Sequence, residues 1–229
     1  MALVSIVTPV YNSAATILET LRSVMAQTHS NWELHIVADE GTRDETPRIV
    51  ESFQDSRIHW HRIAGRGVAK ARNFGMEQSR GRWLAFLDAD DIWLPEKLAR
   101  QIEFMESNKA LLSCHSYRRL RSHTQVVGRA QHPPLLQDYK SLLLNNRLAF
   151  FTALIDRTRL SVPSFQEHPQ EDWIFWLELT RSGVKCHGLQ EVLGFYRVLP
   201  SSRSARDPRL RSRWRILRDR EALGFFHAV

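Results

Sequence analysis

The chain has 229 residues, of which 43% are apolar and 10% aromatic, and its formal net charge is +7. This composition supplies enough apolar side chains for a buried core, and it excludes intrinsically disordered, collagen-like and low-complexity proteins. The two cysteines, Cys114 and Cys186, are too few for the disulfide framework of a small secreted domain. We therefore expect a reducing compartment.

No apolar stretch in the sequence is long enough to cross a membrane. A spanning helix needs about 20 consecutive apolar residues, and the longest apolar region, residues 142–155, is interrupted by Asn145, Asn146 and Arg147. The amino terminus has no basic segment of the kind that opens a signal peptide. We expect a cytoplasmic protein, with peripheral attachment to the inner face of the membrane as an alternative.

Positive charge is concentrated in the second half of the chain. Residues 1–110 contain 13 Lys and Arg against 15 Asp and Glu, whereas residues 111–229 contain 19 against 10. Nine arginines follow position 196. Such a basic tail attracts an anionic ligand, a membrane surface or a nucleic acid, or it forms a solvated helical face. The sequence holds no nucleic-acid-binding motif, which argues against nucleic acid as a partner.

Strand-like and helix-like segments alternate along the first 110 residues. Short apolar runs predict four strands, at 3–8, 32–37, 58–63 and 83–87. Helices are predicted after each of them: one capped by Ser13, one at 45–53, one at 68–79 and one starting at Pro95. This order is typical of an α/β fold with a mostly parallel central sheet and helices on both faces. Ligands of such sheets bind beyond the carboxyl ends of the strands.

The second half of the chain is less regular. Strands are predicted at 114–117, 148–155 and 192–198, and helices at 172–182 and 207–223. No repeat and no flexible linker divides the chain. We therefore expect a single domain over residues 1–229, with a first half at 1–110, a second half at 111–205 and a basic helix or tail at 206–229.

Three carboxylates follow the fourth predicted strand, at Asp88, Asp90 and Asp91. Their mutual repulsion calls for a compensating positive charge. Asp88 and Asp90 are two residues apart, so an extended backbone would point both side chains the same way. Such a pair suits a hard divalent ion that also takes substrate phosphates. The residues alone equally allow an Asp-rich turn that caps the helix near Pro95.

Several short segments occur in an order that is typical of one enzyme family. They are VSIVTPVYN at 4–12, SVMAQT at 23–28, WEL at 32–34 leading to Asp39, GVAKARN at 67–73, FLDADD at 86–91, ED at 171–172 and YR at 196–197. By these segments the chain resembles the family 2 glycosyltransferases, which have the GT-A fold. The resemblance implies a nucleotide-sugar-binding half at 1–110 and an acceptor and catalytic half at 111–205.

The resemblance also implies roles for residues of the nucleotide pocket. Thr8, Pro9, Tyr11 and Asp39 would surround the base, with the Tyr11 ring beside it and the Asp39 carboxylate accepting a hydrogen bond from a ring N–H. Arg72 would help to hold the nucleotide. These roles imply a nucleotide-sugar donor, and UDP is the nucleotide that we expect.

Further positions would contact the diphosphate and the sugar, by the same resemblance. Asp88 would reach the ribose or the donor sugar, and Asp90, together with Asp88, would bind Mg²⁺ or Mn²⁺. Such an ion neutralises a diphosphate leaving group as its bond to the sugar breaks. Arg197 and Arg203 would add phosphate contacts from the segment after the last strand.

The resemblance makes Asp172 the general base, with Glu171 as a neighbour that raises its pKa by like-charge repulsion. An attacking hydroxyl must lose its proton, so a carboxylate within hydrogen-bond reach is required. One base without a covalent intermediate implies direct displacement and inversion, by analogy with inverting glycosidases. Without the resemblance, two acids in the first turn of a helix would be read as favourable charges at its dipole.

One departure from the family pattern concerns the loop after the second strand. The usual acidic pair is Ala38-Asp39 here, and the following segment, residues 40–44, is one residue longer than usual. Two alternatives remain: a sugar-phosphate nucleotidyltransferase, which shares a similar architecture, and a non-catalytic nucleotide-sugar binder, which the missing acid at position 38 allows. The first usually has a glycine-rich loop after strand one, and residues 8–12 contain no glycine. The acceptor would be a carbohydrate or a lipid-linked sugar, and the arginine-rich C-terminus could contact an anionic membrane.

Overall fold

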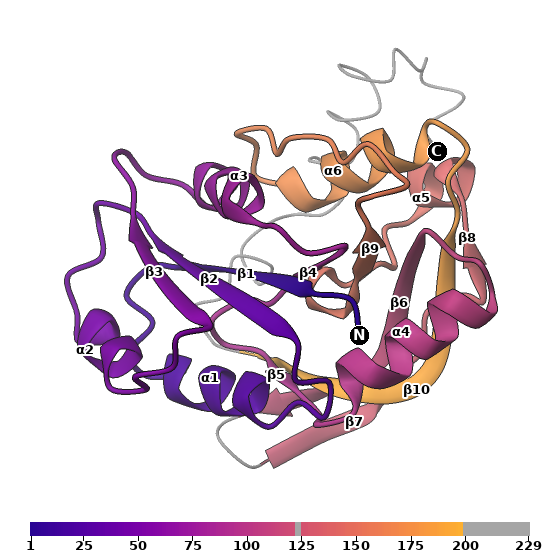
Figure 1. The fold of residues 1–229 in the computed structure, drawn as a ribbon. Helices are drawn as coiled ribbons and strands as arrows, with labels where there is room; N and C mark the ends of the chain where they lie inside the picture. The colour runs from indigo at the N-terminus through magenta and orange to yellow at the C-terminus, as the bar shows by residue number, and fades with distance from the viewer. Residues whose placement is uncertain (122–124, 199–229) are drawn as a thin grey trace.

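The first half of the chain forms a parallel sheet in the computed structural model, which describes residues 1–121 and 125–198 (Figure 1). Its strands are β1 (Val4–Val10), β2 (Trp32–Ala38), β3 (Ile58–Arg62) and β4 (Trp83–Phe86), in the spatial order β3-β2-β1-β4. All three pairings between them are parallel. Their carboxyl ends therefore meet at one edge of the sheet.

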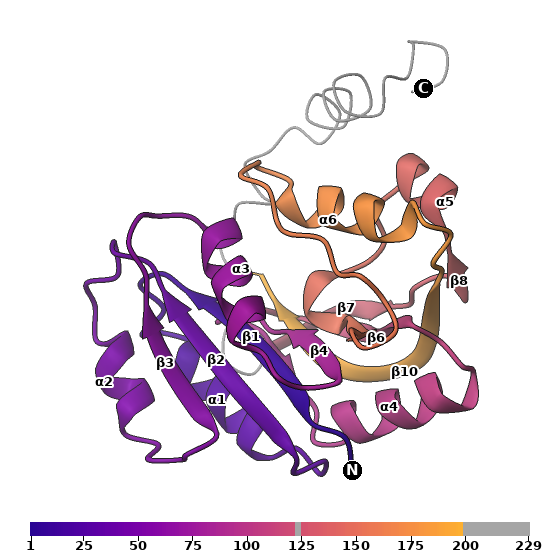
Figure 2. The same cartoon turned by 45° about the horizontal axis from the view of Figure 1, so that its top comes forward.

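Helices cover both faces of this sheet, as Figures 1 and 2 show. The lower layer consists of α1 (Ile17–Met25), α2 (Thr46–Glu51) and α4 (Lys97–Ser107), and the upper layer contains α3 (Val68–Gln78) and α6 (Glu171–Thr180). Alternation along the strands supplies a core to each layer. Ile6 packs into the core that α1 closes, and its neighbour Val7 packs into the core that contains Ala69 of α3. The predicted mostly parallel sheet with helices on both faces is confirmed.

The second half extends the same sheet with mixed strand directions. The short strand β9 (Leu154–Asp156) runs antiparallel between β4 and β6 (Leu112–Arg121). The long strand β10 (Cys186–Arg197) runs parallel to β6. Three further strands pair antiparallel with β6 or β10: β5 (Ile92–Trp93), β7 (Gln125–Gln131) and β8 (Leu136–Gln137). A short helix, α5 (Tyr139–Leu144), follows β8.

Two sequence expectations about local structure are wrong. The strand predicted at 148–155 is a 3₁₀ turn, Phe150–Thr152, followed by β9. Ala149 O accepts both the Thr152 N–H and the Thr152 hydroxyl, and this local bonding competes with a strand ladder. Ser13 does not cap α1 with its side chain. The N-cap is Thr16, whose N–H donates to Ser13 O.

Helix α3 lies close against β1 because a glycine forms the contact. A Cβ added at Gly75 would lie 2.4 Å from Val7 Cγ1, closer than real Cβ contacts allow. This close packing fixes where α3 presents Arg72, one helical turn before Gly75. No helix in the described ranges is long and apolar enough to cross a membrane. The helix predicted at 207–223 lies outside the described residues.

Candidate active site

The loops after β1 and β2 meet around Asp39. This carboxylate is buried and accepts the Gly41 N–H at 2.9 Å and the Gly67 N–H at 3.3 Å. The Tyr11 ring is 58% exposed, and a Cβ on Gly41 would lie 2.8 Å from Tyr11 Cε2. An open aromatic ring thus lies beside a fixed carboxylate. Thr8 is buried at the end of β1, and its hydroxyl has no hydrogen-bond partner among the described residues.

The longer loop after β2 is held by two polar side chains. Asn12 adopts the left-handed conformation, with φ of 46°, and its Oδ1 accepts the Arg43 N–H at 2.8 Å. Asp44 accepts from Ala14 N and from both the N–H and the hydroxyl of Thr46. Burial alone would raise the pKa of Asp44, but these hydrogen bonds to its carboxylate outweigh burial and lower the pKa. Although the loop at 40–44 is one residue longer than usual, it is therefore still anchored to the segment before α1.

Arg72 lies between Asp88, the predicted donor residue, and Glu171, the neighbour of the predicted base. Its guanidinium is almost fully buried and donates to Asp88 Oδ1 at 2.8 Å and to Glu171 Oε1 at 3.0 Å. It also lies over the Phe150 ring, 4.2 Å from the centroid. Burial alone would lower the pKa of Arg72, but Asp88 and Glu171 outweigh it and raise the pKa. Arg72 is therefore a permanent charge that joins the end of β4 to the start of α6.

Asp172 follows Glu171 in the first turn of α6. Its Oδ1 accepts the Trp173 N–H at 2.8 Å. Burial and the charge of Glu171 raise the pKa of Asp172, against the opposing charge of Arg72. A carboxylate with a raised pKa binds a proton more readily, which suits a group that accepts a proton from a hydroxyl. The prediction that Glu171 raises this pKa agrees with the geometry.

The three acids after β4 differ in their surroundings. The Asp88 side chain is 32% exposed, and Asp90 is half-buried. Asp91 is buried, and its Oδ1 accepts the Arg197 N–H at 2.9 Å. Its Oδ2 has no partner among the described residues, and burial together with Asp90 and Asp88 raises the pKa of Asp91 well above its usual range. Asp91 is therefore a structural residue of the loop, whereas the side chains of Asp88 and Asp90 are more exposed.

The chemistry of these acids fits a divalent ion that is shared with a substrate. Within residues 1–121 and 125–198, no group of three or more His, Cys, Asp and Glu side chains is placed to hold a metal. Asp88 and Asp90 would provide two hard oxygen ligands. Mg²⁺ and Mn²⁺ commonly take one or two carboxylates and complete their shell with phosphate oxygens and water.

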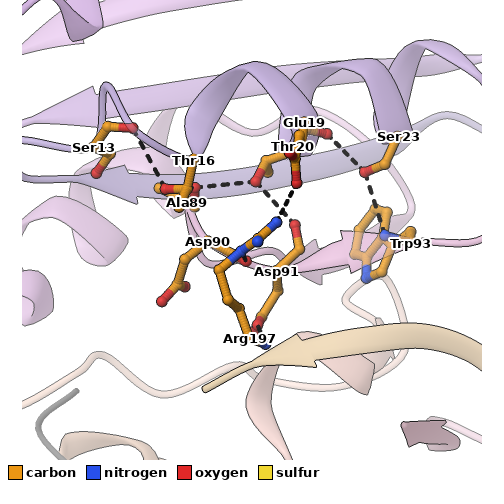
Figure 3. Close-up of polar contacts among 10 residues, drawn as sticks. All are labelled: Ser13, Thr16, Glu19, Thr20, Ser23, Ala89, Asp90, Asp91, Trp93 and Arg197. Carbon is orange, nitrogen blue, oxygen red and sulfur yellow. Dashed lines mark hydrogen bonds and ion pairs between the residues drawn. The ribbon is translucent and has the colours of Figure 1, made fainter. Parts of the chain in front are cut away.

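Arg197 lies beneath this loop, as Figure 3 shows. Its Nε donates to the Asp90 carbonyl at 2.8 Å, and its Nη2 pairs with the Glu19 carboxylate of α1. The side chain is 2% exposed. The expected phosphate contact of Arg197 stays a prediction, because this structure places the guanidinium on the protein backbone. Arg203 lies outside the described residues.

Comparison with known proteins places this geometry in one family. A sequence model described as "Glycosyl transferase family 2" matches residues 5–166. The chain belongs to glycosyltransferase family 2. The UDP-Glc:alpha-D-GlcNAc-diphosphoundecaprenol beta-1,3-glucosyltransferase WfaP of Escherichia coli is 35% identical over 90% of this chain and 81% of its own length.

Two solved glycosyltransferases share the fold. S. aureus TarS 1–349 in complex with UDP-GlcNAc matches with a TM-score of 0.67 at 19% identity, over 90% of this chain and 61% of that chain. The mannosyltransferase PcManGT from Pyrobaculum calidifontis, in complex with GDP-Man and Mn²⁺, matches with a TM-score of 0.66 at 17% identity. The match covers 95% of this chain and 61% of the PcManGT chain. The glycosyltransferase described here therefore spans about three fifths of the length of the TarS and PcManGT chains. These likenesses confirm the GT-A fold.

The structure brings most of the predicted site residues of this glycosyltransferase to one edge of the sheet. Arg72 contacts both Asp88 and Glu171, and Asp172 follows Glu171 in the chain. Sequence reasoning missed the residues of α1 that hold the acidic loop. Their signal is a polar stripe at helical spacing, formed by Thr16, Thr20, Ser23 and Gln27.

Proposed function

We propose that this glycosyltransferase transfers a sugar from a UDP-linked donor to an acceptor hydroxyl by direct displacement with inversion. The observation that carries the proposal is the contact of Arg72 with both Asp88 and Glu171. This contact joins the predicted donor-sugar residue at the end of β4 to the turn that carries Asp172. A donor sugar and an acceptor hydroxyl bound between them would have the proposed base beside the reacting atoms.

The donor proposal rests on the residues at the ends of β1 and β2. Tyr11 offers an open ring for stacking, and the buried Asp39 has a fixed orientation because two backbone N–H groups hold it. A fixed carboxylate acceptor selects a base that presents a ring N–H, as uracil does. Thr8 and Pro9 would complete this wall. The solved complex of TarS with UDP-GlcNAc supports the same nucleotide.

Asp90 and Asp88 would hold Mg²⁺ or Mn²⁺ against the diphosphate. The ion, when bound, supplies positive charge that stabilises the nucleoside diphosphate as it leaves. The Mn²⁺ complex of PcManGT supports this choice. Arg72 would keep Asp88 oriented toward the donor, and Arg197 and Arg203 remain proposed contacts of the diphosphate.

Asp172 would take the proton of the acceptor hydroxyl as that oxygen attacks the anomeric carbon. Its raised pKa makes it a better base than an exposed aspartate. Glu171 is paired with Arg72 and is thereby unavailable as a second proton acceptor. A single base and one displacement invert the anomeric configuration.

We propose an anionic, diphosphate-linked acceptor, such as the lipid in the name of WfaP. Residues 108–137 contain no Asp or Glu but five Lys and Arg. Arg119 and Arg121 are exposed on β6, and Leu120 between them pairs with Arg197 beside the acidic loop. Replacing Arg119 and Arg121 by serine should raise the KM for a diphosphate-linked acceptor several-fold and leave the donor KM unchanged. The exposed Arg48→Ser serves as the control, and equal acceptor KM values would refute this acceptor.

Binding of UDP with and without Mn²⁺ tests the donor and metal proposal. Calorimetry should show tighter UDP binding when Mn²⁺ is present, and Asp90→Asn should abolish that gain while the fold is retained. Glu96→Gln, an exposed acid in the same segment, is the matched control. An Asp90→Asn protein with the full Mn²⁺-dependent gain would refute the metal role.

The basic C-terminus is proposed to attach the enzyme to an anionic membrane surface, and a cytoplasmic location stays a prediction. Truncation after residue 205 removes seven of the nine late arginines, so charge-driven binding to the membrane should fall. Cosedimentation with anionic lipid vesicles measures this. Equal binding of both forms would contradict the attachment.

A further inference from the structure

Three successive carbonyl groups of the acidic loop are held by side chains. Ala89 O accepts from the Thr16 hydroxyl at 2.8 Å, Asp90 O accepts from Arg197 Nε at 2.8 Å, and Asp91 O accepts from the Thr20 hydroxyl at 2.9 Å. Figure 3 shows these contacts on either side of Asp90. Fixing the peptide planes before and after a residue fixes the direction of its Cα–Cβ bond. The backbone of Asp90 is thus immobilised, although its side chain is only half-buried.

Helix α1 and the residues at its two ends supply one side of this support through the polar stripe of Thr16 at the N-cap, Thr20 and Ser23 within the helix, and Gln27 just after it. All four side chains are buried. Ser23 Oγ accepts the Trp93 N–H at 3.3 Å, and Gln27 binds both Leu94 O and the Leu98 N–H. The stripe therefore follows the backbone from Ala89 to Leu98 along one face of the helix.

Arg197 supplies the other side from the end of β10, and Glu19 determines its orientation. The Glu19 carboxylate lies on α1 and pairs with Arg197 Nη2, while Arg197 Nε reaches Asp90 O. The backbone N–H of Arg197 also binds Asp91. The guanidinium is thus held at one end by Glu19 and at the other by the carbonyl of Asp90.

We propose that Arg197 and Glu19 are positioning residues for Asp90, which they preorganise for a divalent ion and a diphosphate. This inference rests on the proposed metal role of Asp90. It differs from a direct phosphate contact of Arg197, because Glu19 then acts by holding Arg197 on the loop. Residues that orient metal ligands through hydrogen bonds typically change metal affinity by about 10–100-fold when they are mutated.

Glu19→Gln separates the two roles of Arg197. The variant keeps the size of the side chain and removes the charge that holds the guanidinium. If Arg197 positions Asp90, the Mn²⁺-dependent gain in UDP affinity should fall about tenfold, while UDP affinity without Mn²⁺ stays unchanged. If Arg197 is instead a phosphate ligand, Glu19→Gln frees it, and UDP affinity should stay equal or rise. Calorimetry with UDP, with and without Mn²⁺, distinguishes these results.

Two further variants make the test decisive. Glu191→Gln breaks the Arg100–Glu191 pair, which also joins β10 to a helix but lies away from the loop, and it should bind as the wild type does. Arg197→Lys combined with Glu19→Gln should lose no more affinity than Arg197→Lys alone, because both act through one carbonyl. The positioning role would be overturned if the two substitutions lowered the UDP affinity additively, or if folded Glu19→Gln kept the full Mn²⁺-dependent gain in UDP affinity. A wild-type protein without any Mn²⁺-dependent gain would instead overturn the proposed function.

Discussion

Arg72 and Glu171 are 99 residues apart in the sequence, yet Arg72 Nη1 donates to Glu171 Oε1 at 3.0 Å, and both side chains are 3% exposed. This pair fastens α3 to the first turn of α6. The other Nη group of Arg72 reaches Asp88. One buried cation therefore sets the distance between the predicted donor residue and the predicted base.

Replacing Arg72 by methionine should destabilise the protein strongly and abolish transfer. The change leaves the buried Glu171 carboxylate without its charged partner, which typically costs about 3–5 kcal/mol. Urea unfolding measures the stability, and a glycosyl-transfer assay measures the activity. Glu171→Gln, which keeps a hydrogen-bond acceptor, should be milder in both. An Arg72→Met protein of wild-type stability would contradict the structural role of the pair.

Glu171→Gln should also move the acidic limb of the pH–rate profile to lower pH. Asp172 must be ionised to act as a base, and burial followed by the charge of Glu171 raises its pKa. Without that charge, and with Arg72 less neutralised, the pKa of Asp172 falls, so activity persists to lower pH. The dependence of kcat on pH checks this. A limb that stays in place or moves to higher pH would exclude Asp172 as the titrating group.

Asp172→Asn should retain UDP binding and lose at least about 100-fold in transfer, the usual contribution of a general base. The amide preserves the size of the side chain and cannot take the proton. Calorimetry with UDP and a turnover assay separate binding from chemistry. Near-normal turnover in this variant would remove Asp172 from the mechanism.

Lys97→Met should stabilise the protein. The Lys97 ammonium is buried in α4, where it lies 3.5 Å from Ala153 O and 3.9 Å from the Trp93 ring centroid. Burial lowers its pKa well below the usual range. Methionine has a similar length and removes the cost of burying the amino group away from water, so the free energy of unfolding should rise. Chemical denaturation beside the exposed control Lys140→Met tests this, and a less stable Lys97→Met would show that the buried amine is needed.

Acidification below pH 6.5 should destabilise the fold through buried histidines. Burial, followed by the charge of Lys97, lowers the pKa of His115 to about 3, and burial also lowers the pKa of His35 and His61. The unfolded chain then binds more protons than the folded one, so stability is full above pH 6.5 and falls as the pH decreases toward the folded values. A histidine that stays neutral costs about 1.4 kcal/mol per pH unit. Urea unfolding at pH 7.5 and 5.5 should show this loss, and His115→Leu should reduce it; identical slopes would refute the assignment.

The sequence predicts best those features that depend on local periodicity. The alternating strands and helices of residues 1–110 follow from short apolar runs, and parallel strands bring Asp39 and Asp88 to the same edge. The strands β5 and β8 escape prediction because two residues carry no periodicity, and β7 escapes because its sequence, QVVGRAQ, contains a glycine and no regular apolar alternation. Arg197 illustrates the limit for the site. Its partner Glu19 is 178 residues away, and no pattern in the sequence distinguishes a guanidinium on phosphate from one on a backbone carbonyl.

The position of β9 has a consequence for any shortened form of this enzyme. Residues 154–156 cover the side of β4 that faces away from β1. A fragment that ended near residue 110 would therefore expose the N–H and C=O groups of β4 as an open edge. Unpaired strand edges recruit other chains, so such a fragment should self-associate instead of remaining a free nucleotide-binding module.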